Sequence, residues 1–175
     1  MRLEISRIRE PHRRLDRTDE PSVFGHEDAY TIVAPVRLGA DLRKDQETVR
    51  FTGSLDTELE LACSRCAEGF RVPVHTDFDL LYLPAASAET AVEHEVQEDD
   101  LETSYYREGI IDLAELVREQ LYLALPMKPL CQETCRGLCP ECGTNLNASI
   151  CACTPIWEDP RLAPLKALAR KQTDA

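Results

Sequence analysis

Cysteine is the residue type most able to do chemistry in this chain of 175 residues, which holds eight of them. Six lie between residues 131 and 153, and the other two form the pair Cys63-Ser-Arg-Cys66. Another pair, Cys139-Pro-Glu-Cys142, is followed by Gly143, which is the form of a zinc knuckle. Two thiolates at this spacing can bind one tetrahedral ion, while glycine lets the backbone turn tightly behind the second sulfur. The cysteines therefore predict metal binding, with zinc as the metal.

The eight cysteines fall into four local pairs, and a tetrahedral zinc ion takes two pairs. These pairs are Cys63 and Cys66, Cys131 and Cys135, Cys139 and Cys142, and Cys151 and Cys153. The last two pairs are separated by only eight residues, so we expect them to share one ion, while the first two pairs meet across the fold on a second ion. An alternative set takes Cys135, Cys139 and Cys142 with one later cysteine and holds a single ion. The spacing of the cysteines is compatible with both groupings.

Sites built only from thiolates favour a structural role, because catalytic zinc keeps an open position and often uses histidine. The four histidines, at positions 12, 26, 75 and 94, are scattered without ligand spacing, and we interpret them as surface residues. The sequence has no glycine-rich phosphate loop, nucleophile elbow or evident pair of catalytic carboxylates. We therefore expect a protein that is not an enzyme and has no small-molecule substrate.

The composition, 43% apolar and 30% charged, is that of a globular protein long enough for one domain or for one domain with a small appendage. The net charge of −12 opposes broad contact with nucleic acid. The first residues lack the apolar run of a signal peptide, and no apolar segment reaches the roughly 20 residues that span a bilayer. Eight cysteines in this setting favour a reducing cytoplasm and metal binding over a disulfide framework.

Charge is unevenly distributed along the chain. Residues 1–17 hold six arginines against three acids, and residues 86–103 hold seven acids with no lysine or arginine. The arginine-rich stretch predicts either a solvated arm or a contact for RNA phosphate or an acidic partner. Its candidate contact residues are Arg7, Arg9, Arg13, Arg14 and Arg17. The acidic stretch predicts a solvated loop, or an acidic surface that mimics RNA or binds a basic ribosomal protein.

The elements expected to position the cysteines begin with β-strands. Residues 2–8 alternate as a half-buried strand does, and residues 31–38 are rich in β-branched side chains. Residues 49–61 alternate, with Gly53 marking a bend, and continue into a hairpin whose tip carries Cys63 and Cys66. Residues 77–83 form a further strand. Four or five antiparallel strands here predict a curled sheet or a small barrel.

Helical spacing follows the acidic stretch. Asp112 and Glu115 have the form of a capping box, apolar residues repeat at helical spacing to Ala124, and Pro126 ends the helix. A closing helix begins near Pro160, or at Pro164, which would otherwise remove a helical hydrogen bond. The expected fold is α+β, with a β-rich core domain and packed central helix in residues 1–130. Residues 131–175 form a cysteine-rich zinc-binding segment and a C-terminal helix.

Four motifs in order resemble the YceD family of large ribosomal RNA subunit accumulation proteins, over most of the chain. They are Cys63-Ser-Arg-Cys66, the run from Leu125 to Cys131, the stretch from Cys139 to Asn147 and Asp159-Pro-Arg-Leu162. The resemblance implies a cytoplasmic, non-catalytic factor needed for normal levels of large-subunit ribosomal RNA. Some relatives keep mainly the first cysteine pair, which implies that the site with Cys139 and Cys142 is an elaboration.

Two classes of function follow from these observations. The first is a zinc-binding factor that acts in synthesis, processing or assembly by binding pre-ribosomal RNA or a large-subunit ribosomal protein. The second is a redox-sensitive zinc thiol switch, since a Cys-x-Cys and a Cys-x-x-Cys on one zinc ion are typical of redox-regulated chaperones. That match is partial, because here the Cys-x-x-Cys comes first and only eight residues separate the pairs. Another zinc-stabilised interaction module is the remaining alternative.

Overall fold

The computed structural model describes residues 1–8, 10–85 and 103–153, and the structural statements below concern these residues. The chain divides into two compact units. The first contains residues 1–63 and 68–131, and the second contains residues 64–67 together with the chain from residue 132 onward. The expected closing helix and its Pro160 and Pro164 lie outside the described residues, as do residues 86–102 of the acidic stretch.

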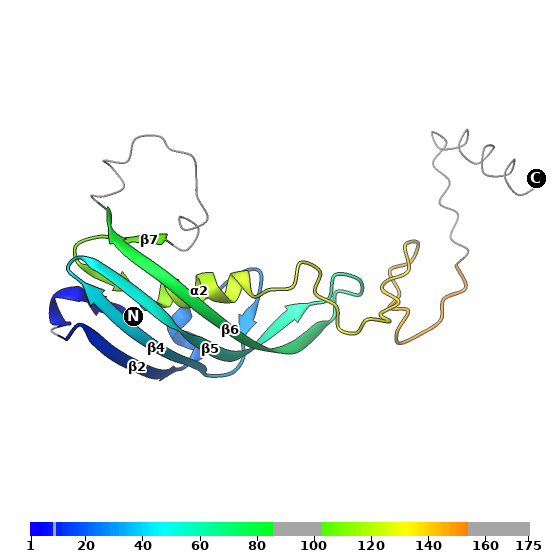
Figure 1. Ribbon diagram of the computed structural model, residues 1–175. Helices are drawn as coiled ribbons and strands as arrows, with labels where there is room; N and C mark the ends of the chain where they lie inside the picture. Colours follow the sequence, from blue (N-terminus) through cyan, green and yellow to red (C-terminus); the bar gives the residue numbers. More distant parts are fainter. Residues whose placement is uncertain (9, 86–102, 154–175) are drawn as a thin grey trace, which may run out of the picture. The chain divides into compact units, whose positions relative to one another are not determined.

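The first unit is built around a six-stranded sheet (Figure 1). Its strands are β2 (His12–Asp19), β3 (Thr31–Ile32), β4 (Val36–Asp45), β5 (Thr48–Ala62), β6 (Gly69–Pro84) and β7 (Thr103–Tyr106). The strand order is β2-β4-β5-β6-β7, with β3 pairing β5. A separate two-stranded sheet pairs β1 (Arg2–Glu4) with β8 (Ile110–Asp112). Sheet with one α-helix among the described residues fits the expected α+β class. Both sheets are open, so the expected barrel or curled sheet is not confirmed.

Three strand predictions need correction. Residues 2–8 do not form one strand, because β1 ends at Glu4 and a 3-10 turn, η1 (Ile5–Arg7), follows. The strand expected over residues 31–38 is two strands, and the gap between them contains Pro35, which has no N–H to donate to a ladder. The further strand expected over residues 77–83 is the second half of β6, which runs unbroken from Gly69 to Pro84. Strand β7 was not expected, and it pairs parallel to β6. A parallel neighbour needs a long connection, and 18 residues separate Pro84 from Thr103.

Alternation along β5 separates a buried face from an exposed one. Val49, Phe51, Leu55 and Leu59 are fully buried, while the residues between them are more exposed. Gly53 lies on the buried face, and a β-carbon there would collide with the carbonyl oxygen of Gly39 and lie 2.7 Å from Ala40 Cα. The strand continues through this position. Gly53 therefore lets β4 and β5 approach closely.

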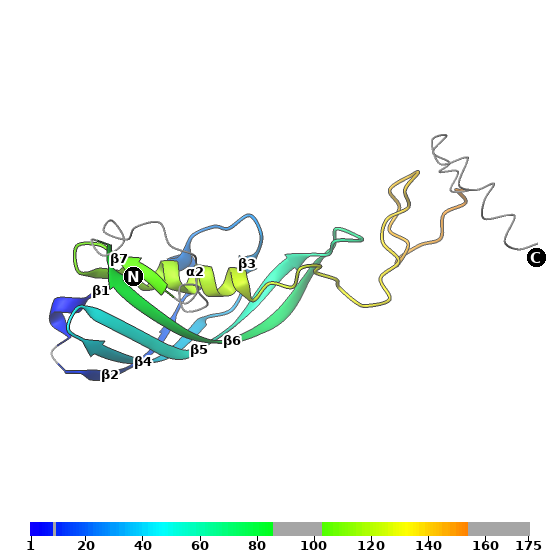
Figure 2. The same cartoon turned by 45° about the horizontal axis from the view of Figure 1, so that its top comes forward.

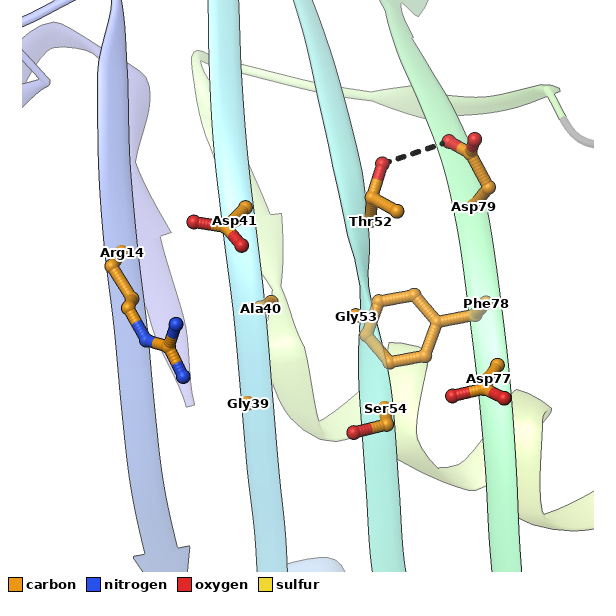
Figure 3. A pocket seen from close by; sticks show the side chains of 10 residues that line it. All are labelled: Arg14, Gly39, Ala40, Asp41, Thr52, Gly53, Ser54, Asp77, Phe78 and Asp79. Carbon is orange, nitrogen blue, oxygen red and sulfur yellow. Dashed lines mark hydrogen bonds between the residues drawn. The ribbon is translucent and has the colours of Figure 1, made fainter.

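The opposite face of the sheet has a shallow hollow of about 630 Å³ (Figure 3). Its floor includes Gly39 and Gly53, which have no side chains to fill it, and polar side chains from four strands surround it. The Thr52 hydroxyl donates a 3.2 Å hydrogen bond to Asp79 Oδ1, and the Arg50 guanidinium donates two 2.7 Å hydrogen bonds to the same carboxylate. These contacts are cross-strand pairs of a solvated sheet face.

The central helix, α2 (Leu113–Leu123), lies along the buried face of the sheet (Figure 2). Asp112 caps it, because its carboxylate accepts a 2.8 Å hydrogen bond from the Ala114 N–H, as the sequence predicts. Its buried apolar side chains complete one hydrophobic core with the strands, and they are Leu113, Ala114, Leu116, Val117 and Leu121. Gln120 is the buried polar residue of the helix. After the helix the chain leads to Cys131.

Candidate metal centre

The turn that joins β5 to β6 carries the first cysteine pair. The Cys63 N–H donates a 2.9 Å hydrogen bond to the Glu68 carbonyl, which closes the turn. Ala67 has a φ of 60°, in the left-handed region. Both thiols are only 3% exposed. This turn therefore presents two shielded sulfurs from neighbouring positions.

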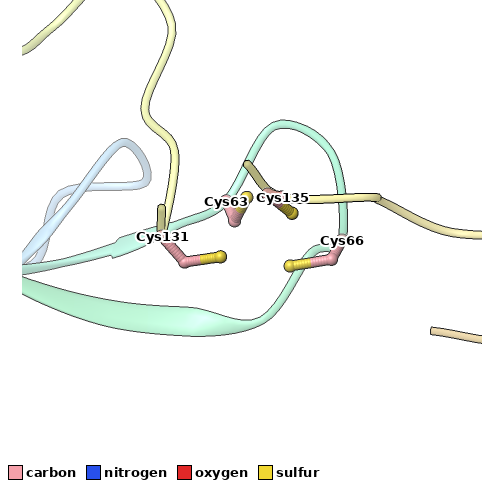
Figure 4. A group of neighbouring side chains, drawn as sticks. All are labelled: Cys63, Cys66, Cys131 and Cys135. Carbon is pink, nitrogen blue, oxygen red and sulfur yellow. The ribbon is translucent and has the colours of Figure 1, made fainter. Parts of the chain in front are cut away.

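Cys63, Cys66, Cys131 and Cys135 form what we term the first cysteine group (Figure 4). Their four sulfurs lie within 4.8 Å of one another. Sulfurs bound to one zinc ion lie about 3.8 Å apart, because the Zn–S distance is about 2.3 Å and the geometry is tetrahedral. The four thiols are thus close enough to bind one ion after small adjustments.

Within the second unit, the hairpin tip is fastened to the chain around Cys135 by Arg65. Arg65 Nη1 donates hydrogen bonds to the carbonyl oxygens of Glu133 (3.2 Å) and Cys135 (2.8 Å). The Arg65 carbonyl accepts a 3.1 Å hydrogen bond from the Leu138 N–H. Gly137 is needed beside it, since its φ is +77° and a β-carbon there would lie 3.0 Å from the Arg65 carbonyl oxygen.

Cys139, Cys142, Cys151 and Cys153 form the second cysteine group, whose sulfurs also lie within 4.8 Å of one another. Its first pair sits on a tight turn. The Gly143 N–H donates to the Cys139 carbonyl (2.9 Å), and the Cys139 N–H donates to the Thr144 carbonyl (2.8 Å). Gly143 has a φ of +71°, which is the conformation that the knuckle pattern requires. In contrast to the first group, Cys142 and Cys153 are exposed.

The thiols of the second group affect one another's ionisation. A hydrogen bond with the Thr144 hydroxyl, 3.1 Å from Cys142 Sγ, is the main cause that lowers the pKa of Cys142 to about 6. The Cys142 thiolate then accepts a hydrogen bond from the Cys153 thiol and raises the pKa of Cys153 to about 12. Four neighbouring thiols do not all lose their protons unless a cation offsets the charge. The donor set is therefore suited to a divalent ion.

The two groups have the same membership as the grouping preferred from the spacing. All eight cysteines lie in the described residues, and no disulfide bond joins any of them. Four sulfur donors in a tetrahedral arrangement suit zinc or iron. Each group could hold one such ion.

The predicted arginine contacts do not form one arm. Arg13, Arg14 and Arg17 lie on the edge strand β2, Arg7 lies in η1, and Arg9 is outside the described residues. Arg13 and Arg17 lie opposite Leu42 and Leu38 of β4, so they share a face of the sheet, while Arg14 lies on the other face. The structure thus divides these side chains between two faces.

Most of these arginines already have acidic partners. Arg7 pairs with Glu4 (2.7 Å), Arg14 with Asp16 (2.9 Å) and Arg17 with Asp19 (2.8 Å). Among the described residues, no ion pair involves Arg13. Binding of phosphate by Arg7, Arg14 or Arg17 would require the local ion pair of that arginine to open.

The three described histidines are exposed, as expected, and each lies near an aspartate. His75 is flanked by Asp56, 2.8 Å from Nδ1, and Asp77, 3.6 Å from Nε2. The hydrogen bond to Asp56, strengthened by its charge, raises the pKa of His75. None of these three histidines belongs to either cysteine group. His94 lies outside the described residues.

Two side chains that support the cysteine groups were not foreseen from the sequence. Arg65 lies inside the Cys63–Cys66 motif, and Asn147 ends the motif that begins at Cys139. Asn147 Nδ2 lies 3.2 Å from Cys135 Sγ. Their place inside cysteine motifs was the one sign in the sequence that they support the cysteine groups, but their contacts depend on residues distant in sequence.

No helix among the described residues has the length and apolarity to cross a membrane.

The fold and the two cysteine groups define a thiol-rich α+β protein with paired candidate metal centres. Residues 51–169 match the model of the family described as large ribosomal RNA subunit accumulation protein YceD. This match covers more than half of the chain, which therefore belongs to the YceD family.

Curated relatives agree with this assignment. The chain is 26% identical over 157 residues to "Large ribosomal RNA subunit accumulation protein YCED homolog 1, chloroplastic" of Arabidopsis thaliana, covering 78% of this chain and 49% of the relative. The Zea mays protein of the same name is 27% identical over 77% of this chain and 53% of its own length. An uncharacterized protein of Mycobacterium tuberculosis is 31% identical over 78% of this chain and 64% of its own. The matched region thus spans about half of the plant relatives, and no solved structure matches the chain.

Proposed function

We propose that this chain is a non-catalytic zinc-binding factor that supports accumulation of large-subunit ribosomal RNA. Membership of the YceD family supports the RNA role. The observation that carries the zinc role is the convergence of all eight thiols into two sets of four. Four thiolates fill the coordination sphere of zinc and leave no position for a substrate. Each ion therefore acts on folding and shape, and the two units form a β-rich domain and a smaller zinc domain.

Zinc at these sites contributes directly to folding. A structural zinc site of this kind supplies roughly 10–16 kcal/mol of binding free energy in peptide systems, which is comparable with the net stability of a whole domain. The segment from residue 132 to residue 153 has few buried apolar side chains and little regular secondary structure. Metal binding is therefore the main source of its order.

The factor acts by binding a large-subunit ribosomal protein or pre-ribosomal RNA in the cytoplasm. The net charge of −12 and the engagement of Arg7, Arg14 and Arg17 in local ion pairs favour a basic protein as the direct partner. The arginines at positions 7, 9, 13, 14 and 17 are the candidate contacts if RNA binds instead. In that case binding is salt-sensitive, and the double variant Arg13→Glu, Arg14→Glu abolishes it.

The first test is the ribosome sedimentation profile, with the ratio of large-subunit to small-subunit RNA, in cells depleted of this protein. We expect a selective loss of large subunits that wild-type protein restores. The double variant Cys63→Ser, Cys66→Ser should not restore it, whereas Ser64→Ala, at an exposed position in the same turn, should. An unchanged profile after depletion contradicts the proposed function.

A redox-sensitive thiol switch is the second candidate, and the exposure of Cys142 and Cys153 favours it. In that case peroxide oxidises these two thiols to a disulfide, peroxide is reduced to water, and zinc leaves the second group. The shielded first group keeps its metal. Zinc release is measured with a colorimetric chelator during mild peroxide treatment, and retention of both ions excludes the switch.

A further inference from the structure

Asn147 lies between the two cysteine pairs of the second group in sequence, yet its side chain contacts the first group. Its Nδ2 is 3.2 Å from Cys135 Sγ, and its Oδ1 accepts a 2.8 Å hydrogen bond from the Arg136 N–H. A backbone N–H can only donate, so it must face the oxygen of the amide. The NH₂ group of Asn147 therefore points at the sulfur as a donor.

The position of Asn147 is fixed by its own turn. The Asn147 N–H donates a 3.0 Å hydrogen bond to Asn145 Oδ1, and the N–H groups of Ala148 and Ser149 both donate to the Asn145 carbonyl at 3.1 Å. The preceding residue, Leu146, donates a 2.9 Å hydrogen bond to the Gly137 carbonyl. This turn is thus attached to the stretch that directly follows Cys135.

The contact matters because of where the sulfur lies. Cys135 is only 2% exposed, so little water can reach its thiolate. A zinc ion with four thiolates carries a net charge of about −2, and donors to the sulfurs disperse that charge. The Asn147 amide supplies such a donor in a place that excludes solvent. Loss of a donor that hydrogen-bonds to a metal ligand typically lowers metal affinity 10–100-fold.

The same geometry joins the two groups. The loop from Cys142 to Cys151 carries Asn147 and is held at both ends when one ion binds the second group. An ordered loop presents the amide to Cys135 without a further loss of conformational freedom. Binding at the second group should therefore favour binding at the first, and the reverse follows by linkage.

We propose that Asn147 is a positioning residue of the first metal site and transmits the occupancy of the second cysteine group to it. This inference rests on the proposed zinc function. It assigns to Asn147 a role separate from that of any metal ligand.

The experiment is a double-mutant cycle on the full-length chain, with metal affinity as the readout. Cobalt(II) is titrated into the reduced protein, and thiolate-to-cobalt charge-transfer absorption reports binding. The first change is Asn147→Ala, and the second is Cys142→Ser with Cys153→Ser, which disables the second group. In the chain that keeps Asn147, we expect the second change to weaken the first site 10–100-fold. In the Asn147→Ala background, it should weaken that site less than threefold.

Equal losses in the two backgrounds would overturn the inference while leaving metal binding intact. A chain that binds no metal would overturn the proposed zinc function itself, and the inference with it. The variant Asn147→Asp keeps the shape of the side chain but replaces the donor with a negative charge, so it should weaken the first site more than Asn147→Ala does. In the cadmium-113 form, the magnetic resonance signal of the first site should shift in both variants. An unshifted signal also counts against the contact.

Discussion

Arg65 donates a 2.8 Å hydrogen bond to the backbone oxygen of Cys135, a residue 70 positions further along the chain. The same nitrogen reaches the Glu133 carbonyl at 3.2 Å. The NH₂ group of Nη1 carries two N–H bonds, fixed in the planar fork of the guanidinium, so it can serve two acceptors at once. The arginine of the hairpin tip therefore organises the backbone that carries a candidate metal ligand.

Replacing Arg65 with alanine should destabilise the zinc-saturated protein by about 1–2 kcal/mol, since hydrogen bonds from charged donors contribute in this range and these are partly exposed. Lysine at this position should recover little, because it lacks the fork. Chemical denaturation with excess zinc measures the effect. Arg71→Ala is the control, because its nearest carboxylate oxygen, on Glu60, is 3.9 Å away and both side chains are exposed. An equal loss of stability in Arg65→Ala and Arg71→Ala would contradict the role of Arg65 in organising the backbone around Cys135.

Gly53→Ala should destabilise the first unit by about 1–3 kcal/mol, because the added methyl group collides with the β4 backbone. Thermal or chemical unfolding, followed by circular dichroism, measures the loss. Gly39→Ala is the matched control on the adjoining strand, since its β-carbon would come no closer than 3.4 Å to Asp16 Oδ1. We expect the control to stay near wild-type stability. A tolerated Gly53→Ala would mean that the two strands can separate at little cost.

His75 should titrate above its ordinary pKa of 6.5, because it hydrogen-bonds to Asp56. A raised pKa in the folded state stabilises the protein fully below pH 6.5, and that contribution disappears as the pH rises through the raised value. Proton magnetic resonance of the imidazole measures the midpoint. Asp56→Asn should lower the midpoint more than Asp77→Asn, since Asp77 is 3.6 Å away rather than 2.8 Å. The opposite order would refute the assignment of Asp56 as the main partner.

Chelation of the metal should unfold residues 132–153 while the sheet of the first unit persists. Trypsin should then cleave after Arg136, which lies in the second unit, and spare the arginines of β4 and β5. Mass spectrometry locates the cuts, and added zinc should restore resistance. Elemental analysis before chelation should find two zinc ions per chain, whereas the alternative grouping requires one. A chelated protein that stays resistant at Arg136 would show that the metal does not maintain this segment.

Local patterns in the sequence predicted the features that depend on neighbours in the chain. The cap at Asp112, the turn at Gly143 and the alternation of β5 were of this kind. The membership of the cysteine groups is the one that the spacing favoured, although the spacing also allowed a set of Cys135, Cys139 and Cys142 with one later cysteine.

Features that depend on distant contacts were missed. The pairing of β1 with β8 and the parallel partner of β6 join segments whose own sequences carry no sign of each other. The arginine-rich stretch was expected to be either a solvated arm or a contact for RNA phosphate or an acidic partner, and its pairing with β4, which divides Arg13 and Arg17 from Arg14 between two faces of the sheet, was not foreseen. Arg65 and Asn147 were overlooked because their role is set by carbonyl and sulfur atoms elsewhere in the fold.

The second unit is assembled from two stretches of chain, residues 64–67 and residues 132 onward, which are made at different times. Ribosomes add roughly 5–20 residues per second, so the 70 residues from Arg65 to Cys135 take roughly 4–14 s to synthesise. During that interval Cys63 and Cys66 are already present while Cys135 is not. The nascent chain therefore exposes a two-thiol site that can capture an ion only weakly or pair with a foreign thiol. An ion held by all four thiols of the first cysteine group would consequently be taken up late in synthesis.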